Sequence, residues 1–411
     1  MKISIDPVIS SRINAAWNKL TSDQQAQLAP QILNANQQAV AVAQTGKAPA
    51  APAAPHHLIL AHSALNNDSD GVVASLDAGV VVDVGPDGVM WGTGKYQQLD
   101  PGWAEAFAVF LESLLGGKHP FMAAPQTIPI PDAVQIGLAG DWGTGEWRTA
   151  ANPAPSTDVG NHLAFLQPDL TIHLGDVYYA GSGDEEQHLL VNLWPPGSIA
   201  SLALNSNHEM YSGANPYFRA IANPPFNLQQ GCSYFALENT HWVIVGLDSA
   251  YFSPEIGLYM DGSLGPDGGT QVMFLQQQVA KGKRVIVLTH HNGLSEDGGT
   301  PTKLWSQVMS GFPLNTGPAC WYWGHVHAGV VYQPQKNGTA EVLCRCCGHG
   351  ALPWGEASEL DNNGNVAWYE KRSAHDPDIP ERVLNGFAML YLEGPNLQEV
   401  FYDENGGVAW P

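Results

Sequence analysis

The positions of Asp, Asn and His residues relative to the apolar runs of this sequence predict a metal site. Five apolar runs, VQIGLAG, LTIHLG, IASLALNS, RVIVLT and ACWYWG, are each followed directly by a residue able to bind a metal ion. These residues are Asp141, Asp176, Asn207, His290, and the alternating pair His325 and His327. Carboxylate, amide and imidazole groups are ligands of first-row transition metals. Each residue alone has a commoner interpretation, such as a helix cap or a turn residue, but five such positions in chain order favour one metal-binding cleft.

Further polar residues adjoin these positions. Tyr179 ends the segment GDVYY, and the run NHE places His208 and Glu209 directly after Asn207. His291 follows His290, and His349 lies in the later loop GHGALPW. Tyr179 has an alternative interpretation as a half-buried core ring, and His291 as an ordinary surface histidine.

The elements that must position these residues are short, almost continuously apolar runs between about 133 and 330. Such runs suit strands that are buried on both faces of a sheet. Their alternation with longer polar, Gly- and Pro-rich segments predicts an α/β domain. Because ligands usually bind at the carboxyl ends of strands in such sheets, the candidate metal ligands are expected to meet in one cleft.

The N-terminal third differs in pattern, and it suggests a division of the chain into four parts. Residues 1–45 are expected to be helical, because Leu20, Leu28, Ile32 and Leu33 recur at helical spacing. Residues 46–55, GKAPAAPAAP, have the composition of a semi-rigid linker. Residues 56–130 mix short β-like runs with a helix near 103–115, and residues 131–411 are expected to form the α/β domain that holds the metal cleft. An acidic loop at 66–77, with Asp68, Asp70 and Asp77, only loosely imitates a calcium loop.

Composition restricts the partners of the protein. The 411-residue chain carries a formal net charge of −22 and only 14% charged residues. So acidic a chain should repel nucleic acids and anionic membranes, and an anionic substrate would need a local positive centre such as bound metal. The five cysteines, three of them in CRCC, do not form a disulfide pattern; free buried thiols are expected, with a zinc site as the alternative. No apolar run follows Lys2, so we expect a cytoplasmic protein without a membrane-spanning segment.

Five blocks together resemble a known family. DWG at 141–143, GDVYY at 175–179, NHE at 207–209, VLTH at 287–290 and GHVH at 324–327 resemble, in order, the signature blocks of the purple acid phosphatases. That family belongs to the calcineurin-like metallophosphoesterase superfamily, and the resemblance covers roughly 133–350. Most of the superfamily has DxH in the first block, but Gly143 stands here, as in purple acid phosphatases, which use a tyrosine of GDxxY instead. Ser206 departs from the glycine that the family usually has there.

The resemblance implies a fold and a ligand set. The fold would be a β-sandwich flanked by helices in four αββα layers, with the N-terminal helical and mixed segment as an extension. Asp176 would bridge two metals. The first would also take Asp141, Tyr179 and His327, and the second Asn207, His290 and His325. A phenol, with a pKa of about 10, suits Fe(III), whereas the other ligands suit divalent Zn, Fe or Mn.

The implied function is hydrolysis of small phosphate monoesters by an acid-phosphatase-like enzyme. A hydroxide on the metals would attack phosphorus. His208 would be the general acid or a phosphate ligand, Glu209 would orient His208 or support a ligand, and His291 would contact phosphate. His349 is a weaker candidate at the rim. Two alternatives remain: a phosphodiesterase or nucleotide pyrophosphatase on the same scaffold, and a non-catalytic metal-binding assembly module. Modules of that kind tend to lose ligands, whereas here every ligand position is filled.

Overall fold

The structure of the protein, a computed structural model, describes residues 5–50, 52–66 and 81–411. The acidic loop containing Asp68, Asp70 and Asp77 lies outside the described residues. Among the described residues, no helix combines the length and the apolar composition that a membrane crossing requires. All five cysteines are free and buried, as expected, and the CRCC segment lies in a strand.

The N-terminal region is built from helices and one small hairpin. Its elements are α1 (Pro7–Trp17), α2 (Ser22–Thr45), the 3-10 turn η1 (His56–Leu58), α3 (Ala61–Leu65), β1 (Val81–Val84), β2 (Met90–Gly92) and α4 (Gly102–Gly116). A capping box between Thr21 and Gln24 starts α2, and Gly46 ends it in the left-handed conformation at φ 65°. The helices expected before residue 45 and near 103–115 are therefore confirmed.

Two large sheets form the centre of the remaining part of the chain. The six-stranded sheet has the order β17 (Val408–Trp410), β16 (Asn396–Asp403), β15 (Gly386–Glu393), β4 (Ala133–Ala139), β5 (Leu170–His173) and β6 (Ala200–Ala203). Its strands β4, β5 and β6 are parallel, and β15 runs antiparallel to β4. Three of the five apolar runs that precede candidate ligands therefore end at the same edge of this sheet.

The nine-stranded sheet carries the other two runs. Its order is β14 (Val366–Tyr369), β11 (Gly329–Tyr332), β13 (Ala340–Cys347), β10 (Cys320–Trp323), β9 (Arg284–Leu288), β8 (Trp242–Gly246), β7 (Phe235–Glu238) and β3 (Thr127–Pro129), with β12 (Gln335–Asn337) paired to β13. Strands β8, β9, β10 and β13 are parallel. The histidines that follow β9 and β10 thus also share one sheet edge.

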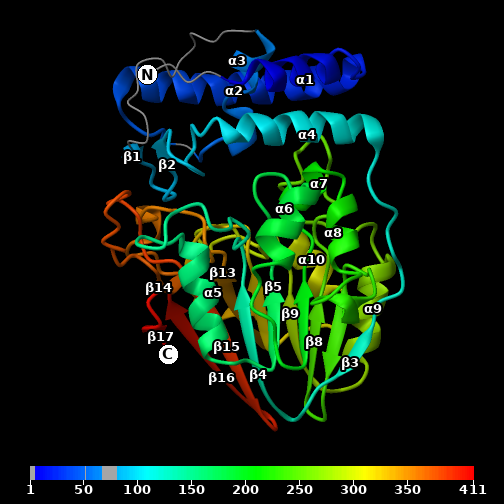
Figure 1. Cartoon of the computed structure of the whole chain (residues 1–411). Helices are drawn as coiled ribbons and strands as arrows, with labels where there is room; N and C mark the ends of the chain where they lie inside the picture. The colour runs from blue at the N-terminus through cyan, green and yellow to red at the C-terminus, as the bar shows by residue number, and fades with distance from the viewer. Residues whose placement is uncertain (1–4, 51, 67–80) are drawn as a thin grey trace.

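The two sheets pack face to face. Ile136 and Ile172 of the first sheet share one buried apolar cluster with Ile286 and Tyr322 of the second. Helix α5 (Pro155–Phe165) covers the outer face of the six-stranded sheet, and α9 (Thr270–Val279) and α10 (Lys303–Met309) cover that of the nine-stranded sheet. The expected α/β sandwich with flanking helices is therefore confirmed (Figure 1).

The remaining short helical elements lie in the connections. They are α6 (Gly183–Glu185), the π-turn η2 (Glu186–Val191), α7 (Asn207–Tyr211), α8 (Asn215–Ala220), η3 (Asn227–Gln229) and η4 (Ser358–Leu360). Helix α7 follows β6, and its Tyr211 ring packs edge-on against Phe110 of α4, with ring centroids 6.0 Å apart. The N-terminal helices consequently lie across one edge of the sandwich, as Figure 1 shows.

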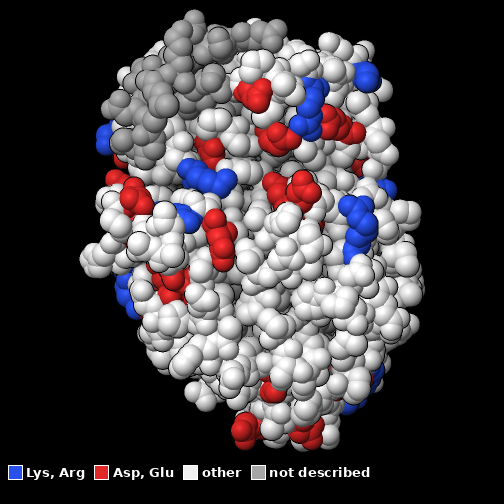
Figure 2. All heavy atoms as spheres, viewed as in Figure 1, with Lys and Arg blue, Asp and Glu red and all other residues white. Residues whose placement is uncertain are grey.

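Charge is sparse on the surface. On the face shown in Figure 2, Lys and Arg atoms of the described residues are interleaved with Asp and Glu atoms, and the lower half is largely uncharged. This face presents no broad basic area that would follow a nucleic-acid backbone, in keeping with the composition.

Candidate metal centre

Two buried carboxylates form the base of the candidate site. Asp141 lies beyond the end of β4 and Asp176 beyond the end of β5, and their side chains are at most 1% exposed. Both have left-handed backbone conformations, with φ of 58° and 77°. Non-glycine residues rarely adopt this region, and where they do they often serve a site. The Tyr178 hydroxyl donates to Oδ2 of Asp176 at 2.9 Å and lies 3.4 Å from Oδ1 of Asp141.

Three histidines and an amide complete the cluster. On one side, Nε2 of His327 lies 3.3 Å from Oδ1 of Asp141 and 3.1 Å from the Tyr178 hydroxyl. On the other side, Nε2 of His290 lies 3.3 Å from Oδ1 of Asp176. Asn207 Oδ1 lies 2.9 Å from Nε2 of His290 and 3.2 Å from Nδ1 of His325. The six non-tyrosine ligand candidates of the sequence therefore lie together, although they come from two different sheets.

Glycines allow this close approach. A Cβ on Gly175, whose φ is 105°, would lie 2.6 Å from Nδ1 of His290. A Cβ on Gly143 would lie 2.7 Å from the carbonyl oxygen of Asp176. No side chain fits at position 143 in this backbone, so the first block cannot supply a histidine here.

The carboxylate pair has no Lys or Arg partner among the described residues. Among the described residues, the only cationic or titratable nitrogens that pair with Asp141 and Asp176 belong to histidines. Burial, reinforced by the Asp176 charge, raises the pKa of Asp141 to about 8. Burial disfavours the His327 imidazolium, but its hydrogen bonds with both carboxylates outweigh this and raise the pKa to about 9. Burial likewise opposes ionisation of Asp176, yet His208 and His290 hold its pKa well below the ordinary value.

The donor set fits two metal ions. Ligand atoms of Asp141, Asp176 and His290 all lie within 4.8 Å of one another, and Asn207 Oδ1 lies within 3.2 Å of a ring nitrogen of both His290 and His325. Buried carboxylates need a compensating positive charge, and this cluster has no Lys or Arg among the described residues that supplies it. Mixed oxygen and imidazole donors suit iron, zinc or manganese. Asp176 lies between the two halves of the cluster, as a bridging ligand would.

The structure corrects the expectation for Tyr179. Its hydroxyl donates to Oδ2 of Asp100 at 2.6 Å and accepts from Nζ of Lys95 at 3.2 Å, away from the cluster. The preceding residue, Tyr178, points at the carboxylates instead. Successive side chains at this turn point in different directions, so only one of the two phenols can reach the site. The spacing of GDxxY favoured the second tyrosine, and the sequence held no signal against it beyond the presence of two tyrosines.

His208 lies where a proton donor could act. The expected direct contact between Glu209 and His208 is not present, because the Glu209 carboxylate faces Ser206 instead. Nδ1 of His208 is 2.7 Å from the carbonyl oxygen of Tyr179, and Nε2 is 3.8 Å from Oδ2 of Asp176. The Glu209 carboxylate contacts the Ser206 hydroxyl, which also contacts Asp176 and accepts the backbone N–H of His208 at 3.0 Å. Ser206, which the sequence marked only as a departure from the usual glycine, therefore links Glu209 to the site.

Two other histidines are placed differently from the expectation. Nδ1 of His291 lies 2.9 Å from the Ser249 hydroxyl, and its Nε2 lies 2.8 Å from the Tyr259 carbonyl. Both ring nitrogens are thus engaged, and His291 does not line the cavity described below, so a phosphate contact is not available to it. His349 is buried behind His327, in a separate small cavity.

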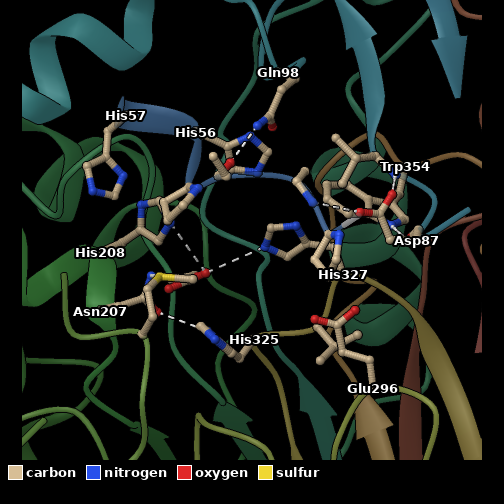
Figure 3. Close-up of a pocket in the computed structure, with 18 of the residues that line it drawn as sticks. His56, His57, Asp87, Gln98, Asn207, His208, Glu296, His325, His327 and Trp354 are labelled. Carbon is tan, nitrogen blue, oxygen red and sulfur yellow. Dashed lines mark hydrogen bonds and ion pairs between the residues drawn. The ribbon is translucent and has the colours of Figure 1, made fainter. Parts of the chain in front are cut away.

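A cavity opens beside the cluster, and the N-terminal region forms much of its wall (Figure 3). Its volume is about 120 Å³. The candidate ligands Asp176, Asn207, His325 and His327 line it together with His208. The lining from before residue 100 consists of Pro52, Ala53, Ala54, Pro55, His56, His57, Asp87, Val89 and Gln98. Sequence reasoning missed this contribution, because residues 46–55 have the composition of a linker and a His-His pair alone gives no signal.

Comparison with known proteins agrees with this site. The family model described as calcineurin-like phosphoesterase matches residues 134–329. The comparison with curated protein sequences found no match. Among solved structures, the chain is similar to purple acid phosphatase PPD1 from yellow lupin (Lupinus luteus) seeds, with 14% identity and a TM-score of 0.49 over 68% of this chain.

The lupin similarity spans 54% of the lupin chain. GAP50, described as the anchor in the inner membrane complex of Plasmodium, is similar with 12% identity and a TM-score of 0.47, over 68% of this chain and 87% of that one. The family match begins at β4 and ends at the start of β11, so it contains every one of the clustered ligand candidates. Residues 134–329 of this chain therefore match the calcineurin-like phosphoesterase family, and this region contains the candidate metal centre.

Proposed function

We propose that the protein hydrolyses small phosphate monoesters at a dinuclear metal centre. Asp141, Asp176, Tyr178 and His327 would hold one ion, and Asp176, Asn207, His290 and His325 the other. Bound there, two ions would neutralise the phosphate charge and activate the attacking water. One observation carries the proposal: two carboxylates at most 1% exposed converge with three histidines, and no Lys or Arg of the described chain compensates them.

His208 is the proton donor in this proposal. Its Nδ1–H donates to the Tyr179 carbonyl at 2.7 Å, which fixes the ring and leaves Nε2 on the cavity side. In the imidazolium form, Nε2 also carries a proton and would give it to the oxygen of the departing alcohol, leaving the neutral ring. Ser206 and Glu209 act indirectly, because Ser206 accepts the backbone N–H of His208 and so fixes the first turn of α7.

Monoesters are favoured over diesters by the shape of the cavity. The second ester group of a diester would need room beside the phosphate. Residues 52–57 and Gln98 line the cavity opposite the metal cluster and narrow it there. This narrowing also disfavours the nucleotide pyrophosphatase alternative, whose substrates are long.

We infer the acid-phosphatase type and the identity of the metals from the types of ligand in the proposed set. A phenol ligand favours Fe(III) at the Tyr178 half of the site, and imidazole with amide favours a divalent ion, Zn, Fe or Mn, at the Asn207 half. The division into an N-terminal extension, residues 1–130, and a catalytic domain, residues 131–411, is part of the same proposal, as is a cytoplasmic location.

Metal analysis and hydrolysis assays on one purified sample test the function. We expect about two metal ions per chain, rapid hydrolysis of 4-nitrophenyl phosphate and much slower hydrolysis of bis(4-nitrophenyl) phosphate. A preference for the bis-ester would favour the phosphodiesterase alternative. Two bound metals with no hydrolysis of either ester would favour the non-catalytic module.

A further inference from the structure

The roof of the cavity comes from outside the phosphoesterase domain. Residues 52–57 and Gln98 precede the matched region 134–329, yet they face Asn207, His208 and His325 across the cavity. The roof is held in place by hydrogen bonds. The backbone N–H of Ala53 donates to the Asp87 carboxylate at 3.1 Å, and that of Ala54 donates to Oε1 of Gln38 at 2.8 Å.

Two buried polar side chains of this roof each have one atom without a hydrogen-bond partner within the described chain. Gln98 is 1% exposed, and its Nε2 donates to the Ala54 carbonyl at 2.6 Å, but its Oε1 has no hydrogen-bond partner among the described residues. His57 is also 1% exposed, and the same holds for its Nε2. Both side chains line the cavity. Buried polar groups are normally paired, so unpaired ones beside a site indicate atoms that a ligand would satisfy.

His56 adds a third polar group and an aromatic surface. Its ring stacks on Trp103 with centroids 4.7 Å apart, and its side chain lies beside that of Gln98, with which it interacts. Figure 3 shows His56 and Gln98 above the cavity, opposite Asn207 and His325. A substrate with its phosphate at the metal cluster would therefore extend its alcohol portion toward these groups.

The charged residues that line the cavity restrict the charge that the alcohol can carry. Apart from Asp176 of the metal cluster, the charged residues that line the cavity are Asp87 and Glu296, and neither Lys nor Arg of the described chain lines it. In Figure 3, Asp87 and Glu296 lie on the same side as Trp354, whose Nε1 donates to the Asp87 carbonyl at 2.9 Å. Carboxylates repel a second negative charge, whereas Gln98 Oε1 and the carboxylates accept hydrogen bonds from hydroxyl or ammonium groups.

The volume of the cavity further restricts which alcohols would fit in it. A cavity of about 120 Å³ has room for roughly ten water-sized groups. A phosphate with a small alcohol fits within that room, whereas a bulkier alcohol such as 4-nitrophenol would project from the open side of the cavity.

We propose, on the basis of the function above, that His56, His57 and Gln98 form a specificity subsite for the leaving alcohol, and that the substrate is a monoester of a small hydroxyl- or amine-bearing alcohol without negative charge. Glycerol 3-phosphate fits this description. 3-Phosphoglycerate, of nearly the same size, carries a carboxylate instead of a hydroxymethyl group and does not.

The first test compares these two esters on the metal-loaded wild-type protein. We expect kcat/KM for glycerol 3-phosphate to exceed that for 3-phosphoglycerate by about tenfold or more, because a buried polar group left unpaired costs at least that much. Equal values, or a preference for 3-phosphoglycerate, would overturn the subsite while hydrolysis of 4-nitrophenyl phosphate still supported the function. Loss of all three activities with metals bound would overturn both proposals.

Variants of similar volume test the residues themselves. Gln98→Met and His57→Phe should each raise KM for glycerol 3-phosphate about tenfold, with unchanged metal content and KM for 4-nitrophenyl phosphate within about twofold, since a nitrophenyl group forms few hydrogen bonds there. His62→Phe, on α3 and outside the cavity lining, is the matched control and should behave as wild type. An equal change on both esters, or none on either, would contradict a subsite for the alcohol.

Discussion

The phenol oxygen of Tyr178 lies 2.9 Å from Oδ2 of Asp176, while the phenol oxygen of the next residue, Tyr179, lies 2.6 Å from Asp100. Two adjacent tyrosines thus serve different purposes. Tyr178 belongs to the candidate metal centre, and Tyr179 anchors the loop to the N-terminal region, where its ring also packs against Trp103 with centroids 4.7 Å apart.

Substitution of the two tyrosines should have opposite effects on the colour of the iron-loaded protein. A phenolate on Fe(III) absorbs visible light, so the oxidised, iron-loaded protein should be pink to purple. Tyr178→Phe should remove this band, because it deletes the oxygen nearest the carboxylates. Tyr179→Phe is the matched control and should keep the colour. A visible spectrum of each iron-loaded variant decides the matter, and bleaching by Tyr179→Phe alone would restore the assignment that GDxxY spacing suggested.

Binding of both metal ions should depend on the Asp176 carboxylate. Asp176→Asn should lower both metal content and activity, because Asp176 faces both halves of the cluster. His325→Ala should weaken mainly the ion beside Asn207, whose Oδ1 lies 3.2 Å from its Nδ1. His188→Ala, an exposed residue of η2, should leave the metal content unchanged. Metal analysis of the three variants measures this, and full occupancy in Asp176→Asn would mean that the centre is misplaced.

His208 should affect leaving groups unequally. His208→Ala should retain the metals but slow hydrolysis of alkyl phosphates by about 10²–10⁴-fold, the usual range for general-acid catalysis. 4-Nitrophenyl phosphate should be slowed far less, since its leaving group needs little protonation. The ratio of kcat values for the two esters is the measurement. Equal loss on both would indicate that His208 binds phosphate rather than donates a proton.

Metal removal should destabilise the folded protein. Without ions, the Asp141 and Asp176 carboxylates face each other while almost fully buried. Ions that bind only the folded state, present at 100 to 1,000 times their Kd, contribute about 3–4 kcal/mol to the free energy of unfolding. Denaturant unfolding with and without a chelator should show this loss, and Asp176→Asn should show much less of it. An unchanged midpoint after chelation would argue against metals in this cluster.

The sequence predicted the strands and most of the cluster for a physical reason. An apolar run such as RVIVLT is typical of a strand that is buried on both faces of a sheet. A polar residue at the end of such a run therefore lies at the edge of the sheet, where ligands bind. What the pattern does not contain is the division of these strands between two sheets. Asp141 and His327, which lie 3.3 Å apart, come from different sheets, and only the face-to-face packing brings them together.

The missed features depend on local geometry or on distant contacts. Which of two adjacent tyrosines turns inward is set by the backbone after β5, and spacing alone cannot show it. The sequence predicted that His291 contacts phosphate. In the structure, Ser249 and Tyr259, which are distant in sequence, contact both of its ring nitrogens. The roof from residues 52–57 has the composition of a linker, and its position over the site follows from helix packing that no motif records.

A crystal structure with anomalous diffraction data collected at the iron and zinc absorption edges tests the central claim most directly. The account predicts two ions in the described cluster, one contacting Asp141, Tyr178 and His327 and the other contacting Asn207, His290 and His325, with Asp176 between them. A single ion held by His290, His291 and His325, or ions bound outside the cluster, would contradict it.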